Sequence, residues 1–270
     1  DRFPVVDHDR LLVVVNQMAE RDNQGKDVAY DPERVRENLT AAFGSEGQWL
    51  PISERVRQVM ANDARYPAPS PETWTPMVDT SIWCARSPVW RGDSRKVPVI
   101  GRHGRDHPLK WLSDPAELRA AYCADKPCKL RFLGGARHAR RRIAPWPSNW
   151  HSAAFGAQDV REFLADLDFF IHYPDVTYIE EFGRAPMEAM AVGVPVVLPP
   201  VFEPTFGSGA LYAEPEEVWP VISALWDDRA AWEARVAAGR DFVREFCSYA
   251  AFPGRIERLR PAELKVANAS

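Results

Sequence analysis

The feature that most constrains the fold is a regular alternation of short apolar segments with capped, amphipathic segments after residue 96. The apolar segments are continuous and rich in Val, Ile and Phe, as strands buried on both faces of a parallel sheet are. The segments between them start with helix signals such as Asp114-Pro115. We expect strands at 97–100, 129–133, 150–155, 169–173 and 194–198, and helices at 113–122, 159–165, 185–192, 215–226, 229–246 and 250–259.

This order predicts an α/β fold with a doubly wound parallel sheet, since parallel strands need crossover connections. In such sheets ligands bind in a crevice at the carboxyl ends of the strands. The polar residues that directly follow each strand are therefore the first candidates for a functional site. No G-x-G-x-x-G motif follows any of these strands, which disfavours a Rossmann dehydrogenase.

The first 95 residues hold a shorter α/β portion. Leu11–Asn16 is an apolar, Val-rich run that predicts a strand, and Asp31-Pro32-Glu33 predicts the start of a helix that Gly44 ends. A second strand is expected at 49–52 and a second helix at 53–61. Residues 66–95 carry five prolines and read as an irregular connector. We therefore divide the chain into 1–95, 96–248 and 249–270.

Composition narrows the class of protein. Hydrophobic residues make up 46% of the chain, which is enough for a real core, and the formal net charge of -4 makes nucleic acid an unfavoured partner. The four cysteines form no C-x-x-C pair, so they predict free thiols in a reducing compartment rather than a disulfide or zinc framework. No apolar run approaches the roughly 20 residues that span a bilayer. A cytoplasmic location is expected.

The strongest motif runs from Glu180 to Val197. A loop with Gly183 enters a helix that has Pro186 in its first turn, where free N–H groups and the helix dipole make an anion site. Glu180 lies before this helix and Glu188 lies on it. Two carboxylates around an anion site suit a ligand with a diphosphate between two hydroxyl-bearing sugars.

The E-x7-E spacing followed by A-M-A-x-G-x-P-V-V resembles the signature of retaining glycosyltransferases of family four (glycosyl transferases group 1). The resemblance covers residues 97 to about 258 and implies a GT-B fold, with 96–248 as the Rossmann-like nucleotide-sugar donor domain. It implies that Glu180 contacts the transferred sugar and that Glu188 binds the ribose. Further donor contacts are expected at Phe182, Gly183, Arg184 and Ala185. The family commonly has Gly or Ser where this chain has Glu181, and that side chain is expected to point away from the diphosphate.

A second motif, Gly101 to Lys110, directly follows a strand. The resemblance implies that Arg102 and Lys110 clamp the donor diphosphate and stabilise charge on the leaving nucleotide. The gap between them is longer than usual, which makes Arg105 a rival for Arg102. A solvated basic loop is the alternative. Gly101 and Gly134 are expected to let backbone approach the nucleotide.

Other polar residues have two readings. His103 and His107 read either as substrate contacts or, as is commoner for loop histidines, as surface residues. The basic run from Arg137 to Arg142 reads either as a solvated face or as a site for anionic lipid or a polyanionic acceptor.

These signals predict a retaining glycosyltransferase that moves a sugar from a nucleoside-diphosphate sugar to an acceptor hydroxyl, by analogy in surface glycan or polysaccharide synthesis. No D-x-D cluster is present, so transfer without a metal or other cofactor is expected. The acceptor remains open among a glycan, a lipid-linked and a small-molecule acceptor, with peripheral contact at the inner face of the membrane as one option.

The portion 1–95 is too short for a whole Rossmann-like half and resembles part of an acceptor-side domain, with 249–270 as the crossing helix and tail. We expect this chain to bind donor but to transfer sugar poorly by itself. Two other classes stay open, a non-catalytic nucleotide-sugar-binding module and a GT-B nucleotide-sugar epimerase.

Overall fold

A computed structural model describes residues 8–20 and 28–260. The chain divides into two compact units. The larger one, called the sheet unit below, comprises Met77–Tyr178 and Gly183–Tyr249. The smaller one comprises the described parts of 1–76 and 250–270 together with Ile179–Phe182.

The sheet unit is built on six parallel strands in the order β5-β4-β3-β6-β7-β8. The chain winds outward from β3 in one direction and from β6 in the other, so the predicted α/β, doubly wound sheet is confirmed. β8 has only two residues and was not predicted, because so short a strand leaves no hydrophobic pattern. The strands are β3 (Val99–His103), β4 (Lys129–Leu133), β5 (Trp150–Ala153), β6 (Phe169–Ile171), β7 (Val196–Leu198) and β8 (Leu211–Tyr212).

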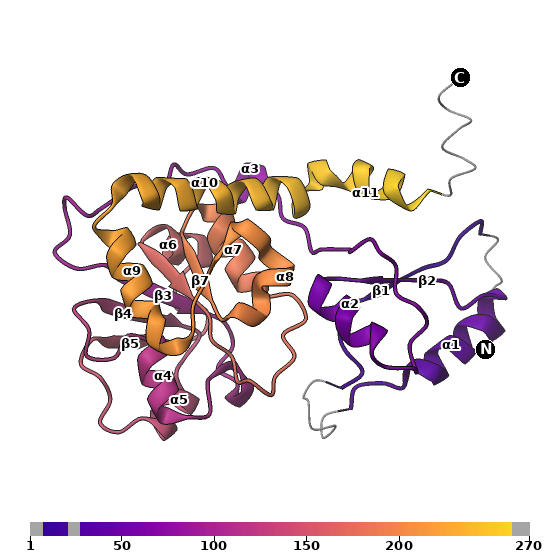
Figure 1. The fold of residues 1–270 in the computed structure, drawn as a ribbon, viewed down its shortest axis with the longest axis horizontal. Helices are drawn as coiled ribbons and strands as arrows, with labels where there is room; N and C mark the ends of the chain where they lie inside the picture. The colour runs from indigo at the N-terminus through magenta and orange to yellow at the C-terminus, as the bar shows by residue number, and fades with distance from the viewer. Residues whose placement is uncertain (1–7, 21–27, 261–270) are drawn as a thin grey trace. The chain divides into compact units, whose positions relative to one another are not determined.

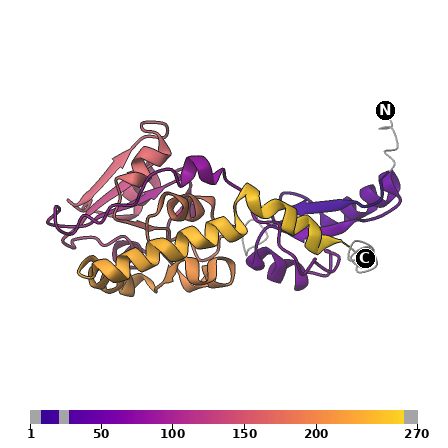
Figure 2. The ribbon, with the colours of Figure 1, turned by 90° about the horizontal axis from the view of Figure 1, so that it is seen from above.

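Helices connect the strands, and most begin where the sequence signals predict. Asp114, Asp159 and Asp228 each accept hydrogen bonds from first-turn N–H groups of the helix that follows. The longest helix, α10, packs against α7, and both views show it running along the sheet unit (Figures 1 and 2). The helices are α3 (Thr80–Trp83), α4 (Pro115–Ala121), α5 (Arg137–Arg142), α6 (Val160–Ala165), α7 (Arg184–Val192), α8 (Glu203–Phe206), α9 (Val218–Trp226) and α10 (Arg229–Phe246), with 3-10 turns at Pro108–Lys110, Pro200–Phe202, Gly207–Gly209 and Pro215–Glu217.

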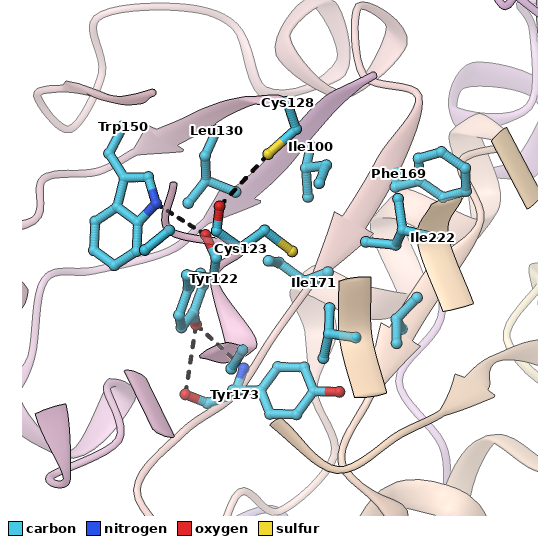
Figure 3. Close-up of a cluster of buried hydrophobic side chains, with 14 of the residues drawn as sticks. Ile100, Tyr122, Cys123, Cys128, Leu130, Trp150, Phe169, Ile171, Tyr173 and Ile222 are labelled. Carbon is cyan, nitrogen blue, oxygen red and sulfur yellow. Dashed lines mark hydrogen bonds between the residues drawn. The ribbon is translucent and has the colours of Figure 1, made fainter. Parts of the chain in front are cut away.

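One face of the sheet carries the main hydrophobic core. Side chains from five neighbouring strands, β5 to β7 in the sheet order, pack there against α4, α9 and the first half of α10. Tyr122 lies in this core with both its polar ends paired (Figure 3). Its hydroxyl accepts from the Tyr173 N–H at 3.2 Å, and its carbonyl accepts from the Trp150 indole N–H at 2.9 Å. The strand residues of the core include Ile100, Leu130, Phe132, Phe169, Ile171 and Val197.

The four cysteines are free thiols, three of them buried. Cys128 donates its S–H to the Cys123 carbonyl at 3.7 Å (Figure 3). Both residues belong to the same hydrophobic core as Tyr122, so they act as small apolar side chains there.

The smaller unit has a two-stranded parallel sheet, formed by β1 (Leu12–Val15) and β2 (Gln48–Pro51). Both expected ends of α1 (Pro32–Phe43) are present: Asp31 caps its start, and Gly44 ends it at a φ of 72°. Ser53, expected as the first residue of the second helix, is the N-cap of α2 (Glu54–Ala61). The last described helix, α11 (Phe252–Leu259), is fastened by its buried Arg255, which donates to the Thr75 carbonyl at 2.6 Å.

The end of the proline-rich connector is fastened to the amino-terminal edge of the sheet by Asp168. This carboxylate is 1% exposed and pairs with Arg91 at 3.4 Å and Arg95 at 2.9 Å. Its Oδ2 also accepts the N–H of Val99, the first residue of β3, at 2.8 Å. A single buried carboxylate therefore joins the connector, β3 and the start of β6.

We expect Asp168→Ala to lower the free energy of unfolding by about 3 kcal/mol, because it leaves two arginines and a strand N–H without their buried partner. Denaturant unfolding checks this as a fall in the midpoint at an unchanged slope. Asp166→Ala is the matched control: Asp166 also pairs with Arg95 but is 51% exposed, and should cost about 1 kcal/mol or less. Equal losses in the two variants would contradict the assignment.

Candidate functional site

The candidate site lies at the carboxyl ends of β3 and β6, where the strand order reverses. In doubly wound sheets the loops on the two sides of such a switch point diverge and open a crevice. The loop after β3 is 104–110, called the cationic loop below, and the loop after β6 leads to α7. The side chains that end β3 and begin α7 are therefore the ones to examine as a candidate site.

The last two side chains of β3 point to opposite faces of the sheet, as strand geometry requires. Arg102 shares its face with Ile100 and meets Trp111 of the main core. His103 lies on the other face, with its ring 5.7 Å from that of Phe170 in β6. Neighbours in sequence thus serve different parts of the site.

Arg102 is 1% exposed, although the sequence predicts a diphosphate ligand for it. Its Nη2 donates to the Lys110 carbonyl at 2.8 Å, and its guanidinium carbon lies 3.9 Å from the centroid of the Trp111 ring. In this structure Arg102 fixes the backbone of the cationic loop. Its direct contact with a diphosphate stays a prediction.

Asp106 fastens the cationic loop from another side. Its Oδ1 accepts the Trp111 indole N–H at 3.0 Å, and its Oδ2 accepts the Arg137 backbone N–H at 2.6 Å. Asp106 thereby supplies the cap of α5, which has no capping side chain at its own N-cap residue. The loop and the start of α5 consequently hold each other in place.

Part of the predicted basic run has a structural role. The half-buried Arg142 donates to the carbonyls of Trp111 at 2.6 Å, Leu112 at 2.8 Å and Pro108 at 3.2 Å. Arg140 and Arg141 are exposed on α5, and Arg140 lies 4.1 Å from the Trp146 ring centroid. For the exposed members of the run, both interpretations stay open, namely a solvated face or a site for an anionic partner.

Two other cations remain on the loop. Arg105 is exposed, and Lys110 is half-buried with its Nζ 4.6 Å from the centroid of the Tyr178 ring. Arg105 is thus the most exposed of the three predicted diphosphate ligands, and Arg102 is the most buried. Which of these cations contacts a diphosphate stays a prediction.

The two predicted donor-binding glycines have packing reasons of their own. A Cβ on Gly134, which has a φ of 109°, would lie 2.0 Å from the Gly104 carbonyl oxygen. A Cβ on Gly101 would lie 2.3 Å from the Leu167 side chain. Both glycines allow close contact within the protein, and their contact with a nucleotide stays a prediction.

The start of α7 matches the predicted anion site in its backbone geometry. Gly183 is the N-cap at a φ of 95°, and no side chain caps the first turn. The exposed Arg184 and half-buried Ala185 follow, with Pro186 completing the turn. First-turn N–H groups without a side-chain cap are suited to an anion.

Glu188 lies one turn further along α7 and is 14% exposed at its side chain. Its Oε2 is 3.2 Å from His103 Nε2. The predicted ribose ligand and a histidine that sequence reasoning placed on a surface loop therefore form a pair at the switch point. The alternation of side-chain directions along the strand from Ile100 to His103 was the sequence signal that could have predicted the position of His103.

The other predicted acidic residues belong to the smaller unit, as Phe182 does. Glu181 accepts the Met18 N–H at its Oε1 at 3.4 Å, and its carbonyl accepts the Ser53 hydroxyl. Burial lowers the pKa of Arg55, and the charges of the half-buried Glu180 and of Glu181 offset part of that effect. The sugar contact of Glu180 stays a prediction.

Over 8–20 and 28–260, no group of three or more His, Cys, Asp or Glu side chains is placed to hold a metal ion. Metal-independent transfer stays a prediction. No helix in the same ranges is both long and apolar enough to cross a bilayer.

Asp175 connects the loop after β6 to the cationic loop, since its N–H donates to the Leu109 carbonyl at 3.0 Å. Its carboxylate is 5% exposed and accepts from the Thr177 N–H and hydroxyl at 3.0 and 2.6 Å. Burial raises the pKa of Asp175, but hydrogen bonds from Thr177 and Ser113 and the charge of Arg142 outweigh it, so the pKa is lowered overall.

Because this pKa is below its unfolded value of about 3.9, the ionised carboxylate stabilises the fold above that pH. The contribution is lost as the pH falls through the folded pKa. Asp175→Asn should cost about 1–2 kcal/mol at pH 7 and lose less stability than the unmodified chain between about pH 4 and 2. Urea unfolding against pH measures this. Asp125→Asn, at a 63% exposed carboxylate and a φ of 59° that Asn tolerates, should leave the acid limb unchanged. Parallel curves for Asp175→Asn and the unmodified chain would contradict the role of Asp175.

No family model and no curated protein matches this sequence. Solved structures do match its fold. HepE from Anabaena, solved with UDP and glucose, superposes with a TM-score of 0.67 at 16% identity over 92% of this chain and 70% of that one. A glycosyltransferase from Rickettsia africae gives 0.66 at 14% identity over 89% and 67% of the two chains.

Sucrose-phosphate synthase from Thermosynechococcus elongatus gives a TM-score of 0.63 at 16% identity, over 96% of this chain and 68% of that one. All three are glycosyltransferases of the GT-B type. At sequence identities this low, the superpositions show a likeness in fold alone. The shared fold extends over about nine tenths of this chain. The chain therefore has the GT-B fold of glycosyltransferases, as the sequence motifs predict.

Proposed function

We propose that this chain binds a nucleoside-diphosphate sugar as the donor part of a retaining glycosyltransferase. The observation that carries the proposal is Glu188 at the switch point of a GT-B sheet, one turn beyond a helix start that no side chain caps. A similar structure, HepE, was solved with UDP and glucose, which supports a nucleotide-sugar ligand for this fold.

Each part of such a donor has a matching group. The diphosphate meets the N–H groups of Arg184 and Ala185 and the cations Arg105 and Lys110. These groups stabilise the charge that develops on the leaving nucleotide as the glycosidic bond breaks. Glu188 accepts hydrogen bonds from the ribose hydroxyls. Arg102 holds the Lys110 backbone in place for this task.

The remaining steps follow from the resemblance. Glu180 contacts the transferred sugar, and the acceptor hydroxyl attacks from the face that the diphosphate leaves, so the anomeric configuration is retained. Arginine and lysine compensate the diphosphate charge without a metal ion. The acceptor is a glycan, a lipid-linked or a small hydroxyl compound, and the reaction takes place on the cytoplasmic side in surface-glycan synthesis.

Donor binding is tested by thermal shift with UDP-, GDP-, ADP- and TDP-glucose. We expect one of them to stabilise the chain by about 2.7 kcal/mol at a hundredfold excess over its Kd. Glu188→Ala should lose this shift while remaining folded. Glu203→Ala, at an exposed glutamate on α8, is the matched control and should keep it. No shift with any donor, or an unchanged shift in Glu188→Ala, would contradict the proposal.

Arg105 should act on the diphosphate alone, because its exposed guanidinium belongs to the cationic loop. We expect Arg105→Ala to weaken binding of the nucleoside diphosphate about tenfold and to leave binding of the nucleoside unchanged. Isothermal calorimetry measures both. Arg141→Ala, at an exposed arginine on α5, serves as control. An equal loss for nucleoside and nucleoside diphosphate would place Arg105 elsewhere.

The other two classes are outcomes of one further assay on the protein with its bound donor. Product with an acceptor, of unchanged anomeric configuration by NMR, supports the retaining transferase. Conversion of the free donor sugar without acceptor indicates an epimerase. Binding with neither reaction indicates a non-catalytic module.

A further inference from the structure

A buried nitrogen at the switch point has no aligned partner. The His103 side chain is about nine-tenths buried, and its Nε2 makes no hydrogen bond in the described part of the chain. Glu188 Oε2 is close, at 3.2 Å, but the contact does not have the geometry of a hydrogen bond. A polar atom and a carboxylate thus sit side by side without a proper hydrogen bond between them.

Packing of the His103 ring accounts for the burial of this side chain but not for its nitrogen without a hydrogen bond. Its edge contact with Phe170, at 5.7 Å between ring centroids, is apolar packing that a phenylalanine would also make. Burying an unpaired polar nitrogen costs free energy that such packing does not require. The nitrogen therefore needs a reason of its own, and native structures leave few buried polar atoms unpaired without one.

The chemistry of the pair selects the ligand group. An anion would be repelled by the Glu188 carboxylate, and an ammonium group would gain nothing from an imidazole N–H. A hydroxyl satisfies both, because it accepts from the N–H and donates to the carboxylate. Glu188 lies one helical turn beyond the uncapped start of α7, so the pair is near any diphosphate bound at that start, as the ribose of a nucleotide is.

We propose that His103 is a donor-binding residue, which together with Glu188 holds a ribose hydroxyl of the nucleotide. The site thereby prefers ribonucleotides to deoxyribonucleotides. This inference rests on the proposed function, since it assigns the ribose contact within the same donor site. It adds a residue that the glycosyltransferase motif does not contain.

The experiment measures calorimetric affinities for UDP, GDP and ADP and for the 2′-deoxy and 3′-deoxy counterparts of each. The unmodified chain should bind its ribonucleotide at least about tenfold more tightly than one of the two deoxy forms. His103→Phe keeps the ring contact with Phe170 but has no N–H. It should weaken ribonucleotide binding about tenfold and leave deoxynucleotide binding unchanged, so the preference disappears. His103→Gln retains an amide N–H and should retain most of the preference.

A second measurement observes the histidines of the unmodified chain directly. In ¹⁵N spectra of the imidazoles, one histidine signal should shift on addition of the ribonucleotide and stay in place with the deoxy form. Loss of that signal in His103→Gln assigns it among the six histidines.

Equal affinities for ribo and deoxy forms would overturn the inference and leave the proposed function standing, because binding is still observed. The same holds if His103→Phe keeps the full preference, or if the imidazole signal does not respond. Absence of binding by UDP, GDP and ADP would overturn the inference, and absence of binding by TDP-glucose as well would overturn the proposed function with it.

Discussion

The site depends on the alternation of side chains at the end of β3. One step along this strand turns Arg102 into the main core, against Trp111, and turns His103 toward the face that α7 covers with Glu188. The same strand is the point where the order of the sheet reverses. One residue pair therefore supplies both the anchor of the cationic loop and, through His103, a polar contact to Glu188 on the other face.

Most of the buried or half-buried charged side chains near the end of β3 hold backbone segments in place. Arg102 and Arg142 give their guanidinium groups to backbone carbonyls of the cationic loop and the residues after it, and Asp106 caps α5. Buried charged groups in such networks hold a loop in one conformation, which is what electrostatic stabilisation of a leaving group needs. Of the predicted diphosphate ligands, Arg105 is exposed and Lys110 half-buried, whereas Arg102 is buried.

Much of the fold could be predicted from the sequence because its signals are local. Apolar runs and Asp-Pro starts mark most strands and helices, and the caps at Asp31 and Asp114 confirm them. Elements that depend on contacts between residues far apart in the sequence could not be predicted in this way. α5 has a single buried residue, Ala139, and takes its cap from Asp106, which lies 31 residues before Arg137, so no periodicity or local cap announces it.

The candidate site also combines residues that local sequence identifies with residues whose surroundings depend on long-range contacts. The E-x7-E motif points to Glu188 directly, whereas Arg102, Gly101 and Gly134 read alike in sequence whether they face a ligand or the protein. Whether such a residue is buried in the protein depends on which loop packs against the end of its strand. The Gly134 position, for example, is decided by the Gly104 backbone thirty residues earlier.

Buried polar atoms without a hydrogen bond are few in the described sheet unit, and two of them lie at the end of β3, besides His172 Nδ1 and Arg240 Nε elsewhere. In the core, Tyr122, Trp150 and Asp168 lie deeply buried with their polar atoms paired. At the end of β3, by contrast, Arg102 Nε and His103 Nε2 are buried without a hydrogen bond in the described structure. Arg102 Nε belongs to a guanidinium that lies against the Trp111 ring, which compensates part of its charge. His103 Nε2 lies 3.2 Å from Glu188 Oε2 without a hydrogen bond, which is why the proposed ribose contact is assigned to this atom.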